Sequence, residues 1–236
     1  MNANLLTNIE KNLAFVRQNM IEYQSNLGEK DRDITLVAVS KRFDISYLQA
    51  AVACGQMDFG ENRVQEFVEK TEQMTSPVRW HFIGHLQTNK VKYVWDKIHL
   101  LHSLDSIKLA EAIDKQVKQH NSTMDALIEV NISKESTKSG IYKEEVNEFI
   151  EKLSRLDGVR IKGLMTMAPF TDDETIVRKT FSGLRQLFDK FAGEDLPSNI
   201  EMKYISMGMS GDYKLALQEG SNMIRIGSGI FGPRKY

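Results

Sequence analysis

The stretch Ile34–Arg42, ITLVAVSKR, is where the prediction of the fold starts. Six of its first seven residues are typical of a buried β-strand, yet the stretch ends in a lysine. Side chains alternate along a strand, so residues 35, 37, 39 and 41 share one face. If that face points into a barrel, Lys41 lies at the mouth of the barrel.

Short apolar runs and helical patterns alternate along the rest of the chain. Eight strands are predicted, and each except the last is followed by a helical pattern. Eight strands with helical crossovers indicate an α/β fold of the (β/α)8, or TIM, barrel type. The strands cover 34–40, 57–60, 79–84, 98–103, 124–132, 159–166, 202–207 and 223–227, and the helical patterns cover 45–54, 62–74, 88–95, 106–120, 142–154, 173–192 and 212–219.

A further amphipathic helix is predicted at residues 3–27, ahead of the first strand. It can cover the wall of the barrel that lacks an eighth helix. No linker rich in proline, glycine or serine divides the chain, so residues 1–236 are expected to form a single domain. The alternative is an open doubly wound sheet, but SKRFDIS after the first strand is not the glycine-rich turn of a dinucleotide site.

Composition excludes several classes of protein. The 236 residues carry a formal net charge of -1, without the basic excess of a nucleic-acid or membrane binder. Cys54 is the only cysteine, which rules out an internal disulfide and favours a reducing compartment. The first twenty residues mix charged and apolar side chains, unlike a signal peptide or a membrane span. We therefore expect a cytoplasmic protein, and the scattered histidines suggest no metal site.

Two glycine-rich loops follow the last two predicted strands, SMGMSGD at 206–212 and IGSGIFG at 226–232. In barrels of this type, phosphate is often held by the loops after strands seven and eight. Glycine lets backbone N–H groups approach an anion closely. Ser210 and Asp212 also fit an ordinary helix-capping turn, and glycine turns are often structural. The two loops together favour a phosphate site.

Three side chains are candidates for the same mouth. Partial burial and nearby cations would lower the pKa of the Lys41 amine from about 10.4, and a neutral amine can form a Schiff base with an aldehyde. Lys41 can equally be a rim lysine paired with a carboxylate. Arg225, flanked by isoleucines in the last strand, needs acceptors if buried: a carboxylate across the barrel, a phosphate or a ring nitrogen. Asn62 follows the second strand and can line the same mouth.

Five motifs give the sequence a family resemblance. They are Val39–Lys41 (VSK), Phe59–Glu66 (FGENRVQE), Trp80–Lys90 (WHFIGHLQTNK), Ser206–Ser210 (SMGMS) and Arg225–Gly232 (RIGSGIFG). The sequence resembles the pyridoxal phosphate homeostasis proteins, the YggS/PROSC family, which are related in fold to the barrel domain of alanine racemase. The resemblance runs from about residue 5 to the C-terminus, and WHFIGHLQTNK is its most specific block.

The resemblance implies a barrel that binds pyridoxal 5′-phosphate (PLP) as an aldimine of Lys41. It implies that Ser210 and the backbone around Gly227 and Ser228 hold the phosphate, that Arg225 faces the pyridine nitrogen and that Asn62 lies near the ring. Met207 and Met209 are further expected contacts of the cofactor, by their place in the loop. An arginine opposite the pyridine nitrogen leaves that nitrogen unprotonated and weakens carbanion stabilisation.

Two classes of function remain open. The first is a non-enzymatic PLP carrier in vitamin B6 homeostasis, with PLP-dependent apoenzymes as partners. The second is an enzyme, either a slow amino-acid racemase or a Schiff-base aldolase acting on a sugar phosphate. Racemases of this fold use a tyrosine from a second β-domain, and this sequence ends at Tyr236, directly after the last glycine-rich loop. The carrier is therefore favoured, and we expect a monomer.

Overall fold

A closed barrel of eight parallel strands forms the centre of the protein, in a computed structural model that describes residues 3–26, 33–135 and 137–233. The first strand pairs with both the second and the last, and the fourth pairs with the fifth, which closes the sheet. The predicted (β/α)8 barrel is confirmed. Its strands are β1 (Thr35–Val39), β2 (Asp58–Glu61), β3 (Arg79–Phe82), β4 (Leu100–Leu104), β5 (Met124–Asn131), β7 (Val159–Met165), β8 (Ile200–Ser206) and β9 (Met223–Ile226).

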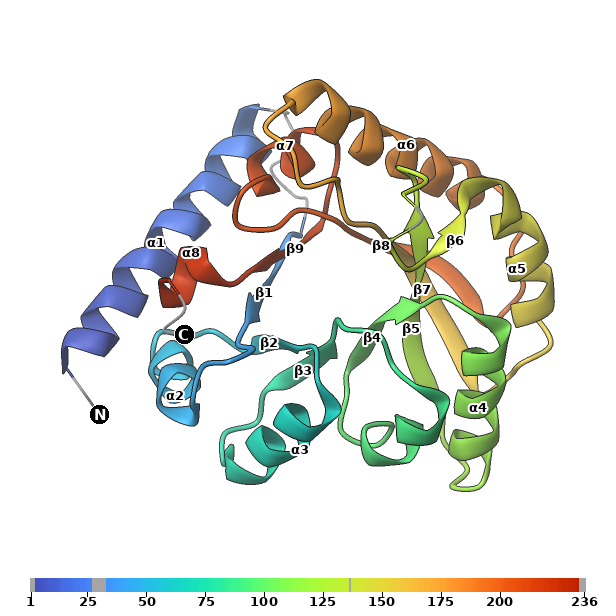
Figure 1. Ribbon diagram of the computed structural model, residues 1–236, viewed down its shortest axis with the longest axis horizontal. Helices are drawn as coiled ribbons and strands as arrows, with labels where there is room; N and C mark the ends of the chain where they lie inside the picture. Colours follow the sequence, from blue (N-terminus) through green and yellow to red (C-terminus); the bar gives the residue numbers. More distant parts are fainter. Residues whose placement is uncertain (1–2, 27–32, 136, 234–236) are drawn as a thin grey trace.

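Helices surround these strands on the outside (Figure 1). Three of them begin at the capping residues Asp44, Ser106 and Asp173, whose side chains accept backbone N–H groups of the first turn. The α-helices are α1 (Ala3–Asn26), α2 (Ile45–Ala53), α3 (Val64–Gln73), α4 (Ile107–Lys118), α5 (Val146–Leu153), α6 (Glu174–Ala192), α7 (Tyr213–Gln218) and α8 (Ser228–Phe231), and two 3-10 helices are η1 (Thr88–Tyr93) and η2 (Lys143–Glu145).

The inner and outer faces of the barrel follow the strand alternation. Val37 packs inside the barrel with Leu100, Leu127, Met165 and Met223. The neighbours of Val37 in β1 belong to the larger core between the sheet and the helices. The prediction that residues 35, 37, 39 and 41 share the inward face agrees with the packing of Val37, and it puts the end of β1 at the mouth of the barrel.

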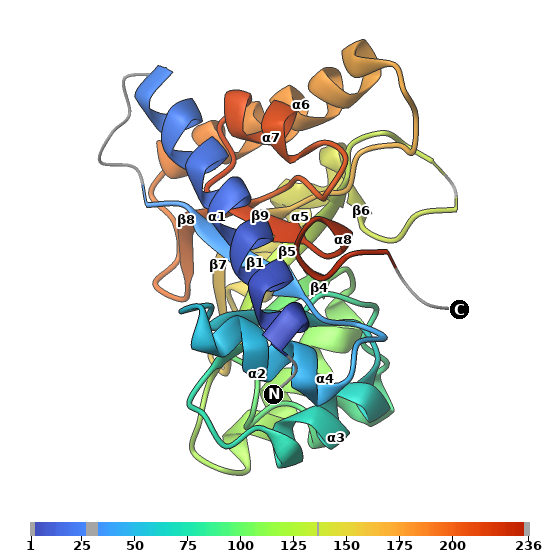
Figure 2. The ribbon, with the colours of Figure 1, turned by 90° about the vertical axis from the view of Figure 1, so that its left-hand side faces the viewer.

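Helix α1 covers the barrel beside its first and last strands. Its buried residues Ile9, Leu13, Val16 and Met20 are spaced four, three and four apart, which forms one helical stripe. The helix contacts α2, α7 and α8, and Figure 2 shows it crossing the face of the barrel near β1 and β9. The extra N-terminal helix is thus confirmed, although residue 27 of the predicted range lies outside the described residues.

Three elements differ from the predicted ones. The helical pattern at 88–95 forms the 3-10 helix η1, which suits its shortness. Strand β6 (Ile141–Tyr142) pairs with the end of β5 and was not predicted, because two residues show no alternation. The last strand, expected to lack a helix, is followed by the four-residue α8. Among the described helices, none is long and apolar enough to cross a membrane.

Candidate functional site

A pocket of about 660 Å³ opens at the carboxyl ends of the strands. This is the end of a (β/α)8 barrel at which active sites are built. The loops after β1, β2, β3, β7, β8 and β9 contribute to its wall. Its lining includes six residues proposed from the sequence, which are Lys41, Asn62, Ser210, Arg225, Gly227 and Ser228.

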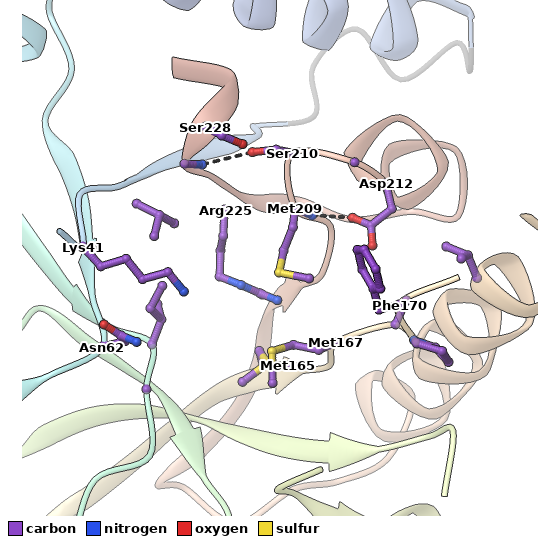
Figure 3. Close-up of a pocket in the computed structure, with 18 of the residues that line it drawn as sticks. Lys41, Asn62, Met165, Met167, Phe170, Met209, Ser210, Asp212, Arg225 and Ser228 are labelled. Atoms are coloured by element: carbon purple, nitrogen blue, oxygen red, sulfur yellow. Dashed lines mark hydrogen bonds between the residues drawn. The ribbon is translucent and has the colours of Figure 1, made fainter. Parts of the chain in front are cut away.

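Lys41 comes directly after β1, and Figure 3 shows its side chain extending into the pocket between Asn62 and Arg225. The backbone on either side of Lys41 is held from outside the barrel. The carbonyl of Ser40 accepts a hydrogen bond of 2.7 Å from Lys70 Nζ, and the N–H of Arg42 donates to the Glu66 carboxylate. These two contacts fix the direction in which the lysine side chain leaves the strand.

A buried ion pair supports this arrangement. Lys70 Nζ lies 2.7 Å from Glu61 Oε1 and 2.6 Å from Glu66 Oε1, and Ser40 Oγ donates to Glu61 Oε1 at 2.6 Å. Burial raises the pKa of Glu61, and Lys70 opposes that shift. Glu61 Oε2 is buried and has no hydrogen-bond partner among the described residues. The pair therefore ties the loop around Lys41 to β2 and α3, and it leaves one buried carboxylate oxygen without a hydrogen bond.

Asn62 and Gly84 lie in contact across the loops after β2 and β3. A Cβ atom at Gly84 would lie 2.3 Å from the carbonyl oxygen of Asn62 and 2.7 Å from its Cα. Only glycine allows the two backbones to approach this closely. The position of Asn62 at the mouth thus depends on a glycine in the next loop.

The two glycine-rich loops are tied together by Ser210. Its hydroxyl oxygen accepts hydrogen bonds from the N–H groups of Gly227, at 3.2 Å, and Gly229, at 3.3 Å. Asp212 accepts a hydrogen bond from the N–H of Met209, so its carboxylate closes the turn before α7 (Figure 3). The loop forms a turn before α7, but Asp212 makes no side-chain capping hydrogen bond to that helix. Ser210 and Gly211 of the loop line the pocket.

Arg225 lies on the inner face of β9 and is 4% exposed. Its guanidinium donates to the hydroxyl of Ser206 and, at 3.0 Å, to the carbonyl of Thr166. Among the described residues, no carboxylate lies within ion-pair distance of the guanidinium. The carboxylate across the barrel, one of the acceptors considered from the sequence, is therefore not its partner. Burial lowers the pKa of Arg225 to about 10, although Asp212 and Glu129 raise it. The guanidinium is therefore charged at neutral pH.

Two residues differ from the sequence-based picture of the site. Met207 is fully buried in the outer core, so of the two methionines expected near the cofactor only Met209 lines the pocket. Glu129, which sequence reasoning missed, also lines the pocket while only 4% exposed. Burial raises its pKa to about 7, and Asp105 adds to the rise. Alternation with Leu127 in ALIEVN could have identified Glu129 as an inward-facing carboxyl.

Comparison with known proteins fits the geometry of this pocket. The family model "Alanine racemase, N-terminal domain" matches residues 11–235. The pyridoxal phosphate homeostasis protein of Aquifex aeolicus is 41% identical over 210 residues, covering 89% of this chain and 91% of the relative. The chain belongs to the pyridoxal phosphate homeostasis protein family.

Solved structures place this homeostasis family on the racemase fold. PipY of Synechococcus elongatus, solved with PLP bound, is 29% identical and superposes with a TM-score of 0.83, covering 95% of this chain and all of that one. Alanine racemase of Corynebacterium glutamicum superposes with a TM-score of 0.73 at 14% identity. That likeness covers 97% of this chain but 62% of the racemase, and it shows the fold alone.

Proposed function

We propose that this chain binds PLP in the pocket at the mouth of the barrel and acts in vitamin B6 homeostasis. Lys41 holds the cofactor through a Schiff base, which its amine forms with the PLP aldehyde as one water leaves. The protein carries and buffers the cofactor, and has little or no catalysis of its own. PLP-dependent apoenzymes are the proposed recipients, and the proposed working unit is a monomer.

One observation carries this proposal. A lysine, an arginine and two cross-tied glycine-rich loops line the same pocket. PLP offers an aldehyde, a pyridine nitrogen and a phosphate, and each has a matching group there. The aldehyde matches Lys41, the ring nitrogen matches Arg225, and the phosphate matches Ser210 with the backbone of Gly227 and Ser228. The names of the relatives and the PLP bound to PipY support the same cofactor.

Arg225 supports the proposal that catalysis is weak. PLP, when bound, supplies an electron sink for carbanions, and the sink is strongest when its ring nitrogen is protonated. An arginine that stays charged can only donate to that nitrogen, so it leaves the nitrogen without a proton. The buried hydrogen bonds of Arg225 to Ser206 and Thr166 fix the guanidinium in the pocket. The residues present therefore favour holding the cofactor over reacting through it.

The test is a visible absorption spectrum of the purified protein with added PLP. Borohydride reduction and peptide mass mapping follow, with the variants Lys41→Ala and Lys108→Ala beside the wild type. Lys108 is an exposed lysine on α4 and serves as the matched control. We expect a yellow wild type and a yellow Lys108→Ala, a reduced adduct on Lys41, and no such adduct in Lys41→Ala. A wild type that stays colourless with PLP would overturn the proposal.

A second experiment separates the carrier from an enzyme. The PLP-loaded protein is incubated with a PLP-dependent apoenzyme, and the activity of that enzyme is followed while free PLP is trapped. The loaded protein is also incubated with α-deuterated amino acids. Restored enzyme activity without loss of deuterium supports the carrier. Loss of deuterium that depends on Lys41 would support the slow racemase instead, and cleavage of a ketose phosphate without PLP would support the aldolase.

A further inference from the structure

Buried hydrogen bonds connect the arginine of the pocket to the opposite end of the barrel. Arg225 donates to Ser206 Oγ, and Ser206 Oγ lies 3.1 Å from His102 Nδ1. His102 Nε2 lies 2.9 Å from His81 Nδ1, and His81 Nε2 lies 3.0 Å from Asp58 Oδ1. We call these five residues, Asp58, His81, His102, Ser206 and Arg225, the interior chain.

The interior chain runs across the inside of the barrel. Asp58 begins β2, so it lies at the amino-terminal end, while Ser206 ends β8 at the carboxyl-terminal mouth. Each member is less than 9% exposed. Arg79 caps the far end with two hydrogen bonds to the Asp58 carboxylate, of 2.7 and 2.6 Å. The pocket is thus linked to the amino-terminal end of the barrel through side chains alone.

The protonation states of Asp58 and His102 restrict where the hydrogens lie along the interior chain. Burial would raise the pKa of Asp58, but hydrogen bonds from His81 and Arg79 lower it to about 2, so the carboxylate only accepts. His81 Nε2 therefore carries a hydrogen. Burial holds the pKa of His102 well below its ordinary value, so His102 is neutral and carries one ring hydrogen.

Two proton arrangements are compatible with these constraints. In the first, His81 is neutral, His102 donates from Nε2 to His81, and Ser206 donates to His102 Nδ1. Every donor then points towards Asp58, and the lone pairs of Ser206 accept from Arg225. In the second, His81 is doubly protonated, and His102 donates from Nδ1 to Ser206. That hydroxyl then receives two donors, and its own hydrogen loses its acceptor.

We propose that His102 is a positioning residue for Arg225. The interior chain keeps its hydrogens in the first arrangement, in which every donor points towards Asp58. The proposal rests on the proposed function, in which Arg225 faces the ring nitrogen of PLP. In this arrangement the Ser206 hydroxyl donates its hydrogen to His102 and accepts only from the guanidinium of Arg225. The negative charge of Asp58 polarises each hydrogen bond of the interior chain. The far end of the barrel thereby sets how strongly Arg225 acts on the cofactor.

Several charged or titratable groups face the two histidines. His81 faces Asp58 on β2 and His99 just before β4, and it shares the Asp58 carboxylate with Arg79 of its own strand. His102 faces His81 on β3 and Arg225 on β9.

The test begins with nitrogen-15 NMR of the histidine rings in the ligand-free wild type, which reports the tautomer of each ring. At pH 8 we expect the hydrogen on Nε2 in both His81 and His102. A His102 ring protonated on Nδ1 would overturn the proposal. This measurement needs no cofactor, so it stands even if PLP does not bind and the proposed function fails.

The second measurement compares Asp58→Asn with Asp125→Asn in the PLP-loaded protein. Asp125 pairs with Arg160 of the adjacent strand at 2.6 Å, much as Asp58 pairs with Arg79. Within the part of the chain that the structure describes, Asp125 makes no hydrogen bond to the interior chain. Both variants should attach PLP to Lys41. The measured quantity is the pH at which the two absorption bands of bound PLP interconvert half-way. This midpoint should move to lower pH by roughly half a unit in Asp58→Asn alone. Equal midpoints in both variants and the wild type would contradict the proposal.

Discussion

Glu129 brings a titratable carboxyl group into the same pocket as the charged Arg225. Burial raises the pKa of Glu129 from 4.5 to about 7, and the carboxylate of Asp105 contributes to the rise. The folded state therefore binds this proton more tightly than the unfolded state does. Between about pH 4.5 and pH 7 the unfolded chain has released the proton while the folded chain keeps it, so stability falls as pH rises through this window.

Glu129→Gln should remove that pH dependence. The rise from 4.5 to about 7 corresponds to about 3 kcal/mol of unfolding free energy, present below pH 4.5 and lost by pH 8. Relative to the wild type, the ligand-free variant should gain stability as pH rises from 5 to 8, because the amide never ionises. Urea unfolding at a series of pH values measures the difference.

Glu72→Gln on the exposed face of α3 is the matched control, since it makes the same chemical change outside the pocket. Its stability difference from the wild type should stay nearly constant between pH 5 and pH 8. Parallel stability curves for the wild type and Glu129→Gln would show that the buried carboxyl does not titrate in this range.

At the level of elements, Gly84 controls how closely two loops of the mouth approach. Gly84→Ala would push a methyl group into the backbone of Asn62, which no side-chain rotation relieves. We expect a loss of about 1–3 kcal/mol in stability and weaker PLP binding, because Asn62 must move. Chemical denaturation and PLP titration measure the two effects.

Gly193→Ala is the control for the alanine substitution itself. Gly193 caps the end of α6, and its added Cβ would meet neighbouring atoms at an ordinary 3.6 Å. Stability and PLP affinity should both stay close to the wild type. If Gly84→Ala behaved like Gly193→Ala, the close approach of the loops would not matter for the site.

Helix α1 offers a second prediction at this scale. Leu13 is a buried residue of α1. This helix contacts α8, which is part of the second glycine-rich loop, and Asn12 of α1 donates to the carbonyl of Ile230 in α8. Leu13→Ala should cost about 2–5 kcal/mol of stability and also weaken PLP binding. Leu153→Ala in α5, equally buried on another side of the barrel, should cost a similar amount of stability.

PLP affinity distinguishes Leu13→Ala from Leu153→Ala. It is measured at a temperature where both variants remain folded. Leu153→Ala should bind PLP as the wild type does, because α5 contributes no residue to the pocket lining. Equal losses of affinity in the two variants would mean that general destabilisation, and not the support of α8 by α1, weakens the site.

The sequence predicts elements whose pattern is local and long enough to repeat. The eight barrel strands and helix α1 show alternation or helical spacing over several residues, and the structure contains all of them. The loops after β8 and β9 were recognisable because glycine and serine mark backbone turns wherever the chain goes. Strand β6 and the short α8 span too few residues to leave such a pattern.

Contacts between residues far apart in the sequence could not be predicted. His102 and Ser206 are 104 positions apart, and nothing in LHSLD or YISMG indicates that their side chains meet. The histidines appeared scattered along the chain, but three neighbouring parallel strands bring Asp58, His81 and His102 into line. Only the closure of the barrel creates this arrangement.

For the whole molecule, that closure joins the first and last strands of the barrel beside the pocket. Strand β1, which leads to Lys41, pairs with β9, which carries Arg225, so Val37 and Arg225 lie side by side in the sheet. A ligand held by Lys41 on one side and by the loop after β9 on the other therefore favours the closed barrel. Binding stabilises the folded state because the separated strands of the unfolded chain cannot form the site.

We therefore expect PLP to stabilise the barrel as one cooperative unit. At a PLP concentration 100 times its dissociation constant, the unfolding free energy should rise by about 2.7 kcal/mol. Hydrogen exchange should slow in β1 and β9 together with β5, on the far side of the barrel, since all three strands open in the same event. Lys41→Ala should lose most of this gain while unfolding in a single transition. Protection confined to β1 and β9 would instead mean that the β1–β9 pair opens on its own. PLP would then stabilise this pair of strands without stabilising the rest of the barrel.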